Sequence, residues 1–224
     1  MNPSSRLTRF LFLVVGMVFC PLATVMAINA NVGTSSWVIF QQGLSRFTGI
    51  TYGTASILVS MGVLLVTVVL GESFGIGTLY DIIMTGVLYD LFDRMGFVPV
   101  CHGVWSGLLM LTASQLLTAW GCCLYMGAGF GAGPRDGMFT AIVRRFPKAP
   151  ISVIKWGIDG AILVLGWLMG GKLGWGTVFI ILSGGISFQL VFRLCRFRPE
   201  AVHHENIRET FQALFRSRAS TPKQ

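Results

Sequence analysis

Charged residues are scarce in this chain. Only 12% of its 224 residues are Asp, Glu, Lys or Arg, while 53% are hydrophobic, and a soluble domain carries about 25% charged residues. This shortage excludes an ordinary soluble protein and predicts a protein that crosses a membrane several times. The net charge of +8 does not predict nucleic-acid binding, because most of the basic residues flank apolar segments and act there as topology signals.

The sequence also lacks the motifs of the common enzyme classes. It has no Gly-x-x-x-x-Gly-Lys-Ser/Thr loop, so nucleotide hydrolysis is not the expected energy source. The apolar segments hold no cluster of histidine and carboxylate residues, no nucleophile elbow and no metal motif. The five cysteines show neither metal-ligand spacing nor a disulfide framework. We therefore expect a protein that is not an enzyme and that binds no metal or cofactor.

Long apolar runs are what the chain has in abundance. A membrane span needs about 20 mostly apolar residues, and six segments reach or approach this length. They cover residues 10–30, 52–70, 79–92, 104–126, 151–170 and 175–194. The sequence therefore predicts an all-α membrane protein with six transmembrane helices, within a membrane domain of residues 1–198.

Basic residues are distributed unequally between the two sides that six spans define. One side would hold Arg6, Arg9, the basic cluster at 144–148 and the tail, and the other only three isolated basic residues. An excess of Lys and Arg marks the cytoplasmic face, so both termini are expected in the cytoplasm. In the basic tail, residues 199–224, apolar side chains recur at helical spacing, which predicts an amphipathic helix on the inner leaflet.

Two segments are too short or too polar to span. Residues 31–46 follow the first span, and residues 136–146 follow the fourth, behind a glycine-rich break at 127–137. We predict that each of these two stretches forms a half-helix or a re-entrant segment. Irregular backbone at membrane depth is tolerated only where it is buried in protein or lines a wet cavity. The N-cap of the first half-helix is expected among three hydroxyl residues, Thr34, Ser35 and Ser36.

A short motif repeats along the chain. Gly75-Ile-Gly-Thr78 recurs as Gly174-Trp-Gly-Thr177, 99 positions later (177 − 78), and the half-helices recur at nearly the same offset. The chain thus divides into repeat one, about 7–98, and repeat two, about 104–195. Three spans per half is an odd number, so the halves would be inverted in the membrane, an arrangement that points to a transporter's central site. In the alternative interpretation the motif is a common helix start that recurs by chance.

Four charged residues at membrane depth are candidate site residues. Arg135 and Asp136 form either an intramembrane pair on a solute path or a surface turn in which Asp136 caps the next helix. Asp81 and Asp159 are either coupling carboxylates in the bundle interior or structural residues. In the structural interpretation, Asp159 pairs with Lys155 four residues earlier, and Asp81 lies near the membrane interface.

The segment Gly131-Ala-Gly-Pro-Arg-Asp-Gly-Met138 resembles the signature of the YczE-type branch of the YczE/YitT bacterial membrane proteins. Further matches include Trp37, the stretch Gln42-Gly-Leu-Ser-Arg-Phe-Thr-Gly49 and Gly75-Ile-Gly-Thr78. The resemblance covers about residues 7–195. It implies a multi-pass protein of the bacterial inner membrane, usually described as a transporter without an established substrate.

The resemblance also implies further site residues. Such proteins tend to read Gly-Pro-Trp-Asp in the first half where the second half reads Gly-Pro-Arg-Asp. This chain reads Ser35-Ser-Trp-Val38 in the first half, so the proline and aspartate are replaced. The added candidates are Ser35, Ser36, Trp37, Gly133 and Pro134, with Asp136 left as the stronger acidic member. Trp37 alternatively belongs to an aromatic belt. Gln41 and Gln42 either bind a solute or satisfy backbone groups.

Two functions are compatible with these patterns. The first is a secondary transporter or permease of a small solute, driven by a gradient of ions or protons. The second is a non-transporting accessory or scaffold protein that supports another enzyme or exporter. A scaffold has no need for charged residues that face a wet cavity. The lipid bilayer is the expected partner in both cases, and a homo-oligomer stays open because small-residue runs allow close helix contact within or between chains.

Overall fold

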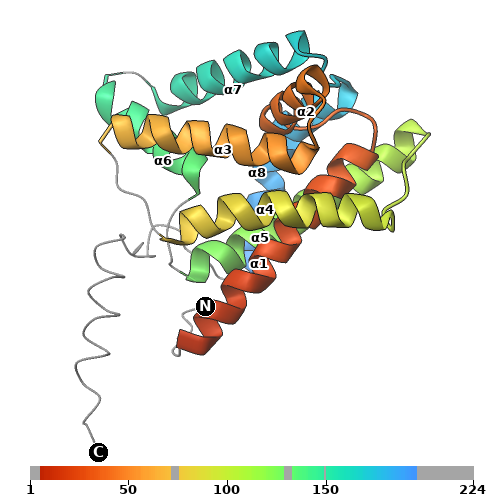
Figure 1. The fold of residues 1–224 in the computed structure, drawn as a ribbon, viewed down its shortest axis with the longest axis horizontal. Helices are drawn as coiled ribbons and strands as arrows, with labels where there is room; N and C mark the ends of the chain where they lie inside the picture. Colours follow the sequence, from red (N-terminus) through yellow and green to blue (C-terminus); the bar gives the residue numbers. More distant parts are fainter. Residues whose placement is uncertain (1–5, 72–75, 129–132, 149, 196–224) are drawn as a thin grey trace, which may run out of the picture.

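The computed structural model describes residues 6–71, 76–128, 133–148 and 150–195 (Figure 1). Within these residues the chain forms eight α-helices and no strand. The helices are α1 (Arg6–Asn29), α2 (Ser36–Thr48), α3 (Tyr52–Val69), α4 (Ile76–Met95), α5 (Val104–Ala128), α6 (Pro134–Arg145), α7 (Ile151–Leu168) and α8 (Trp175–Leu194). Each predicted span and both predicted short helices coincide with one of these, so the all-α prediction is confirmed. The predicted tail helix at 199–224 lies outside the described residues.

Four helices in the described part of the chain are long and apolar enough to cross a membrane, namely α1, α3, α5 and α8. Their outward faces carry exposed large apolar side chains, such as Trp105 on α5 and Leu182 on α8. Such faces suit contact with lipid rather than with water. The helices at the other two predicted spans, α4 and α7, also carry charged residues, among them Asp81 on α4 and Asp159 on α7.

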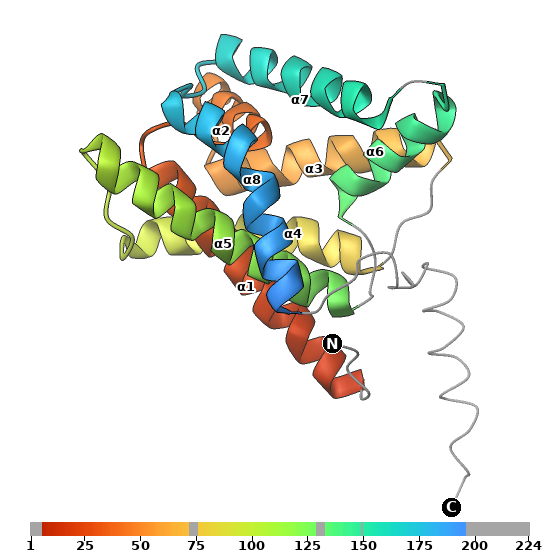
Figure 2. The same cartoon turned by 180° about the vertical axis from the view of Figure 1, so that it is seen from behind.

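The centre of the molecule is the pair α1 and α5, which run side by side in opposite directions (Figures 1 and 2). A Cβ atom at Gly16 of α1 would lie 2.7 Å from the carbonyl oxygen of Gly121 on α5, so only glycine allows this approach. Small residues at a helix interface bring two backbones together in this way. Helix α4 packs on the α1 side of the pair and α8 on the α5 side.

The two short helices pack against the other half of the chain. Helix α2 contacts α7, and α6 contacts α3. At the first of these contacts, a Cβ atom at Gly166 of α7 would lie 2.6 Å from the backbone nitrogen and Cα of Phe40. Buried apolar residues of α3 and α6, including Val63 and Met138, pack with Trp37 and Ile158 in one apolar cluster. Four helices from both halves therefore meet at one place.

The second Gly-x-Gly-Thr motif begins α8 and packs against the break between α1 and α2. Gly33 has a positive φ of 101° and lies against Gly174. The backbone N–H of Gly176 donates to the carbonyl oxygen of Val32 at 2.7 Å. This motif therefore anchors the first broken segment to the second half. Gly75 of the first motif lies outside the described residues.

The N-cap residue of α2 agrees with the sequence-based expectation, whereas the start of α6 differs from it. Helix α2 has Ser35 as its N-cap, but the Ser35 side chain makes no capping hydrogen bond. Helix α6 has Gly133 as its N-cap and begins at Pro134, because proline has the φ that the first helical position requires. Asp136 is therefore the third residue of α6, and the interpretation of Asp136 as an N-cap is wrong.

Asp90 provides a cap from a neighbouring helix. Its carboxylate accepts from the Gly53 N–H at 2.8 Å and from the Thr51 hydroxyl at 2.6 Å, at the start of α3. A carboxylate is favourable at this helix end because the first N–H groups have no partner within the helix. The contact fixes α3 against α4, and these two helices form one wall of the cavity described below.

We expect Gly166→Ala to destabilise the protein. The added methyl group would press on the Phe40 backbone, which cannot move aside, and overpacking costs about 1–3 kcal/mol. The measurement is the thermal unfolding midpoint in lipid nanodiscs, followed by near-UV circular dichroism. Gly160→Ala on the same helix is the matched control, because a Cβ there meets nothing within 4 Å. Equal midpoints for both variants would show that the α2–α7 contact is looser than described.

Candidate functional site

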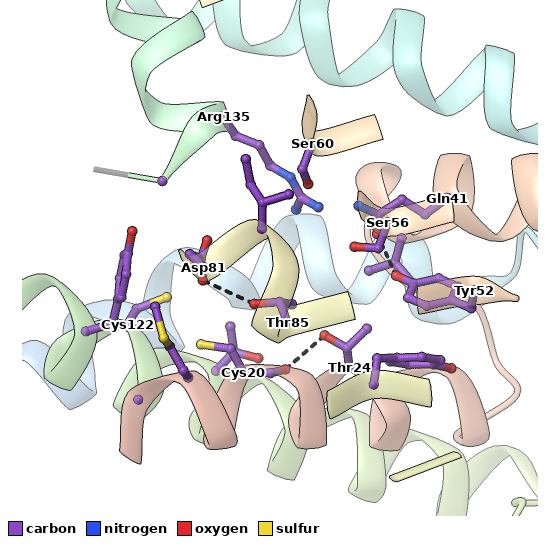
Figure 3. Close-up of a pocket in the computed structure, with 18 residues that line it drawn as sticks. Cys20, Thr24, Gln41, Tyr52, Ser56, Ser60, Asp81, Thr85, Cys122 and Arg135 are labelled. Atoms are coloured by element: carbon purple, nitrogen blue, oxygen red, sulfur yellow. Dashed lines mark hydrogen bonds between the residues drawn. The ribbon is translucent and has the colours of Figure 1, made fainter. Parts of the chain in front are cut away.

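A cavity of about 290 Å³ lies inside the helix bundle (Figure 3). Helices α1 to α5 line it together with Gly133 and Arg135 at the start of α6. It therefore lies where the first repeat meets the beginning of the predicted second one. Polar side chains from six helices line it, which is unusual for the interior of an apolar bundle because buried polar groups need partners.

Arg135 reaches the cavity from the first turn of α6. The side chain is half-buried, and Figure 3 shows it extending from α6 towards the cavity centre. Its guanidinium carbon lies 4.8 Å from the ring centroid of Trp37 on α2. A guanidinium over an indole face gains about 0.5–2 kcal/mol, and the larger values apply when both groups are desolvated. The stacking fixes the position of the positive charge.

Trp37 is in turn held by α7. Its ring N–H donates to Asp159 at 3.2 Å, and the other carboxylate oxygen of Asp159 lies 3.3 Å from the Lys155 ammonium nitrogen. The structure therefore brings together Arg135, Trp37 and Asp159 from three helices. Asp159 does not line the cavity. Its place behind Trp37, paired with Lys155, agrees with the structural interpretation of this residue.

Asp81 provides a negative charge on the cavity wall. It lies on α4 among interior residues of the bundle and is half-buried. The Thr85 hydroxyl, one turn further along, donates to Asp81 at 3.1 Å. Asp81 therefore lines the cavity, next to Thr85 on the same helix. The cavity has a basic residue and an acidic residue on different helices (Figure 3).

Gln41 places an amide donor at the cavity. The side chain is 1% exposed, and its oxygen accepts from the Tyr52 hydroxyl at 2.6 Å. The amide nitrogen has no hydrogen-bond partner in the described structure, although it is buried. An unmade buried hydrogen bond costs about 1–3 kcal/mol. Gln42, the other glutamine considered from the sequence, instead accepts from the backbone N–H of Lys172 at 3.0 Å.

The remaining sequence candidates are less central. Gly133 lines the cavity. Ser35 and Ser36 begin α2 and do not line it, and Ser36 is buried. The side chains of Pro134 and Asp136 lie outside the described residues.

Several lining residues carry a sequence signal that had no part in the predictions. Tyr52, Ser56 and Ser60 recur every four residues along the otherwise apolar α3, and Asp81 and Thr85 do so on α4. Side chains four apart lie on one helix face. Polar residues at this spacing within an apolar span therefore indicate which face of the helix lines a polar cavity.

Cys122 is expected to react with a small water-soluble methanethiosulfonate reagent, and Cys123 is not. Cys122 lines the cavity, whereas the adjacent Cys123 is buried among packed side chains. Two variants are compared, one that keeps only Cys122 and one that keeps only Cys123, with all other cysteines changed to serine. The Cys122 thiol should react about tenfold faster or more than the Cys123 thiol, since reactivity follows exposure. The rates are measured by mass spectrometry in intact membranes. Equally slow reaction of both thiols would mean that the cavity is dry.

Comparison with known proteins gives the family. The model of the "Family of unknown function (DUF6198)" matches residues 7–193. An uncharacterized protein of Haemophilus influenzae is 30% identical over 75% of this chain and 76% of its own length. The "Uncharacterized membrane protein YczE" of Bacillus subtilis is 26% identical over 80% of this chain and 82% of its own. "Uncharacterized protein YyaS" of the same organism is 24% identical over 80% and 89%. No solved structure matches the chain.

The resemblance inferred from the Gly-Pro-Arg-Asp-Gly segment is thus confirmed. Both the matched family model and the relatives extend over α1 to α8 or most of this region, so the likeness concerns the membrane domain as a whole. With apolar helices long enough to cross a bilayer and a relative named as a membrane protein, the chain is an integral membrane protein that belongs to the family DUF6198.

Proposed function

We propose that this protein is a secondary transporter or permease that moves a small solute through the cavity that α1 to α6 line. The observation that carries the proposal is a polar cavity with Arg135 and Asp81 on its walls inside an apolar helix bundle. Charged residues at membrane depth cost about 2.5–3.5 kcal/mol each on insertion scales, and they commonly mark substrate or ion paths. A protein with no transport role has no need for two such residues to face an open space.

The proposal includes six spans in two inverted repeats. The contact pattern supports this, because most contacts have a counterpart in the other half. Helix α1 packs on α4 and α5 on α8, while α2 packs on α7 and α6 on α3. The pairs α1/α5 and α3/α7 run in opposite directions (Figures 1 and 2). Two inverted halves around a central site form the usual frame for alternating access.

One departure from the symmetry also favours a transport cycle. Helices α3 and α4 pack closely, whereas the corresponding α7 and α8 make little contact in the described structure. Alternating access requires the two halves to differ in this way, so that one side is closed when the other is open.

The location of the proposed transporter is the bacterial inner membrane, with both termini in the cytoplasm. The start of α1 and the end of α8 lie towards the same side of the molecule (Figure 2). With six spans, most Lys and Arg residues of the sequence fall on the side that holds both termini, and an excess of these residues marks the cytoplasmic face. The proposed energy source is a gradient of protons or ions, and the protein carries out no chemical reaction on its solute.

The test is flux through purified protein in proteoliposomes, with a panel of radiolabelled amino acids, organic acids, amines and sugars. We expect a flux in the wild type that falls about tenfold or more in Arg135→Gln and Asp81→Asn, because each removes a charged hydrogen-bonding group from the path. Arg193→Gln is the matched control, since Arg193 is exposed near the end of α8 and does not line the cavity.

Two results would contradict the proposal. One is equal flux in the wild type and in folded Arg135→Gln and Asp81→Asn proteins. The other is absence of flux for the whole panel under an imposed proton or sodium gradient, which would favour an accessory protein that needs no solute path.

A further inference from the structure

We propose that the solute is a small zwitterion with an apolar body, of the α-amino acid class. Its carboxylate would bind Arg135 and Gln41, and its ammonium group would bind Asp81. This inference rests on the proposed transport function and names the chemistry of its substrate.

The donor side of the cavity suits a carboxylate. The Arg135 guanidinium carbon lies over the Trp37 ring, and a guanidinium group has a planar fork of N–H donors that matches a carboxylate. The Gln41 amide nitrogen is a second donor, buried, lining the cavity and without a hydrogen-bond partner in the described structure. Figure 3 shows Arg135 and Gln41 extending towards the same region, beside Ser56. A ligand oxygen there would satisfy the amide.

Tyr52 fixes which atom of Gln41 is the donor. The Tyr52 hydroxyl donates a hydrogen bond to the Gln41 amide oxygen at 2.6 Å. The NH₂ group of Gln41 has no such bond and is therefore the part of the amide that can bind a ligand. An amide that presents only its donors selects an acceptor such as a carboxylate and disfavours an ammonium group.

The acceptor side of the cavity suits an ammonium group. Asp81 supplies carboxylate oxygens, which accept but do not donate. The Thr24 hydroxyl donates to the Cys20 carbonyl oxygen at 2.9 Å, so towards the cavity it offers lone pairs. An inorganic anion would use only the donor side and would be repelled by Asp81. A zwitterion uses both sides, and its two charges offset those of the walls.

Size and wall chemistry limit the rest of the solute. The cavity volume of about 290 Å³ is just below the range of about 300–1,000 Å³ typical of pockets for drug-sized ligands. The lining also includes the apolar residues Met17, Val38 and Ile82. An apolar side chain of modest length can pack against these residues, whereas a sugar would leave several hydroxyl groups without partners against them.

The test is ligand binding to the full-length protein in lipid nanodiscs by isothermal titration calorimetry. The probes are L-leucine, L-leucinamide, which lacks the carboxylate, and 4-methylpentanoate, which lacks the ammonium group. We expect L-leucine to bind about tenfold tighter or more than either analogue, because each analogue makes one fewer charge-assisted hydrogen-bonding contact with the cavity walls.

Variants assign each wall to one end of the ligand. Gln41→Leu should weaken binding of L-leucine and 4-methylpentanoate about tenfold and leave binding of L-leucinamide unchanged. Asp81→Asn should weaken binding of L-leucine and L-leucinamide but should not weaken binding of 4-methylpentanoate, because it removes a charge that repels the carboxylate. Gln42→Leu is the matched control, because Gln42 bonds to the Lys172 backbone and does not line the cavity. Near-UV circular dichroism establishes that each variant is folded.

The outcomes separate this inference from the transport function itself. Binding of 4-methylpentanoate as tightly as L-leucine would overturn the zwitterion in favour of a monocarboxylate. No binding of L-leucine or of L-valine, L-methionine and L-phenylalanine, together with Arg135-dependent flux of another solute, would overturn the amino acid class and leave the transporter standing. Absence of any Arg135-dependent flux would overturn both.

Discussion

The interior of a membrane bundle offers no bulk water to a charged group, and the position of Arg135 follows from this constraint. Its guanidinium must be solvated by protein, so it lies over the Trp37 ring and faces a polar cavity. Trp37 can serve this purpose because Asp159 on α7 holds its ring N–H. One half-buried charge thereby takes part in a chain of contacts that joins α6, α2 and α7, three helices that are far apart in the sequence.

The glycine contacts and the polar cavity both follow from the way in which helices pack in lipid. In lipid, helices gain little from hydrophobic association and instead depend on close packing and hydrogen bonds. Gly16 and Gly121 bring α1 and α5 into backbone contact at one level. Beside this contact the bundle stays open, with Cys20, Thr24 and Asp81 around the space. Tight packing at one level keeps the open space stable at another.

The sequence was sufficient to locate the helices, because the length of an apolar run and the glycine or proline residues at its ends determine where a membrane helix begins and stops. Spatial relationships were harder to obtain. Trp37 and Asp159 were each considered, but their hydrogen bond joins residues 122 positions apart, and no local pattern encodes such a contact. Gln41 was considered only as one of two glutamines. The start of α6 was misplaced because Pro134 initiates the helix two residues before Asp136.

The exchange of short helices between the halves has a consequence for biosynthesis. Helix α2 emerges from the ribosome early, yet its packing partner α7 is more than one hundred residues further along the chain. Until synthesis reaches α7, Gly43 and Ile39 lack the surface on which they pack. The N-terminal half therefore waits in an incomplete state during translation, and the protein matures only when the last third of the chain has entered the bilayer.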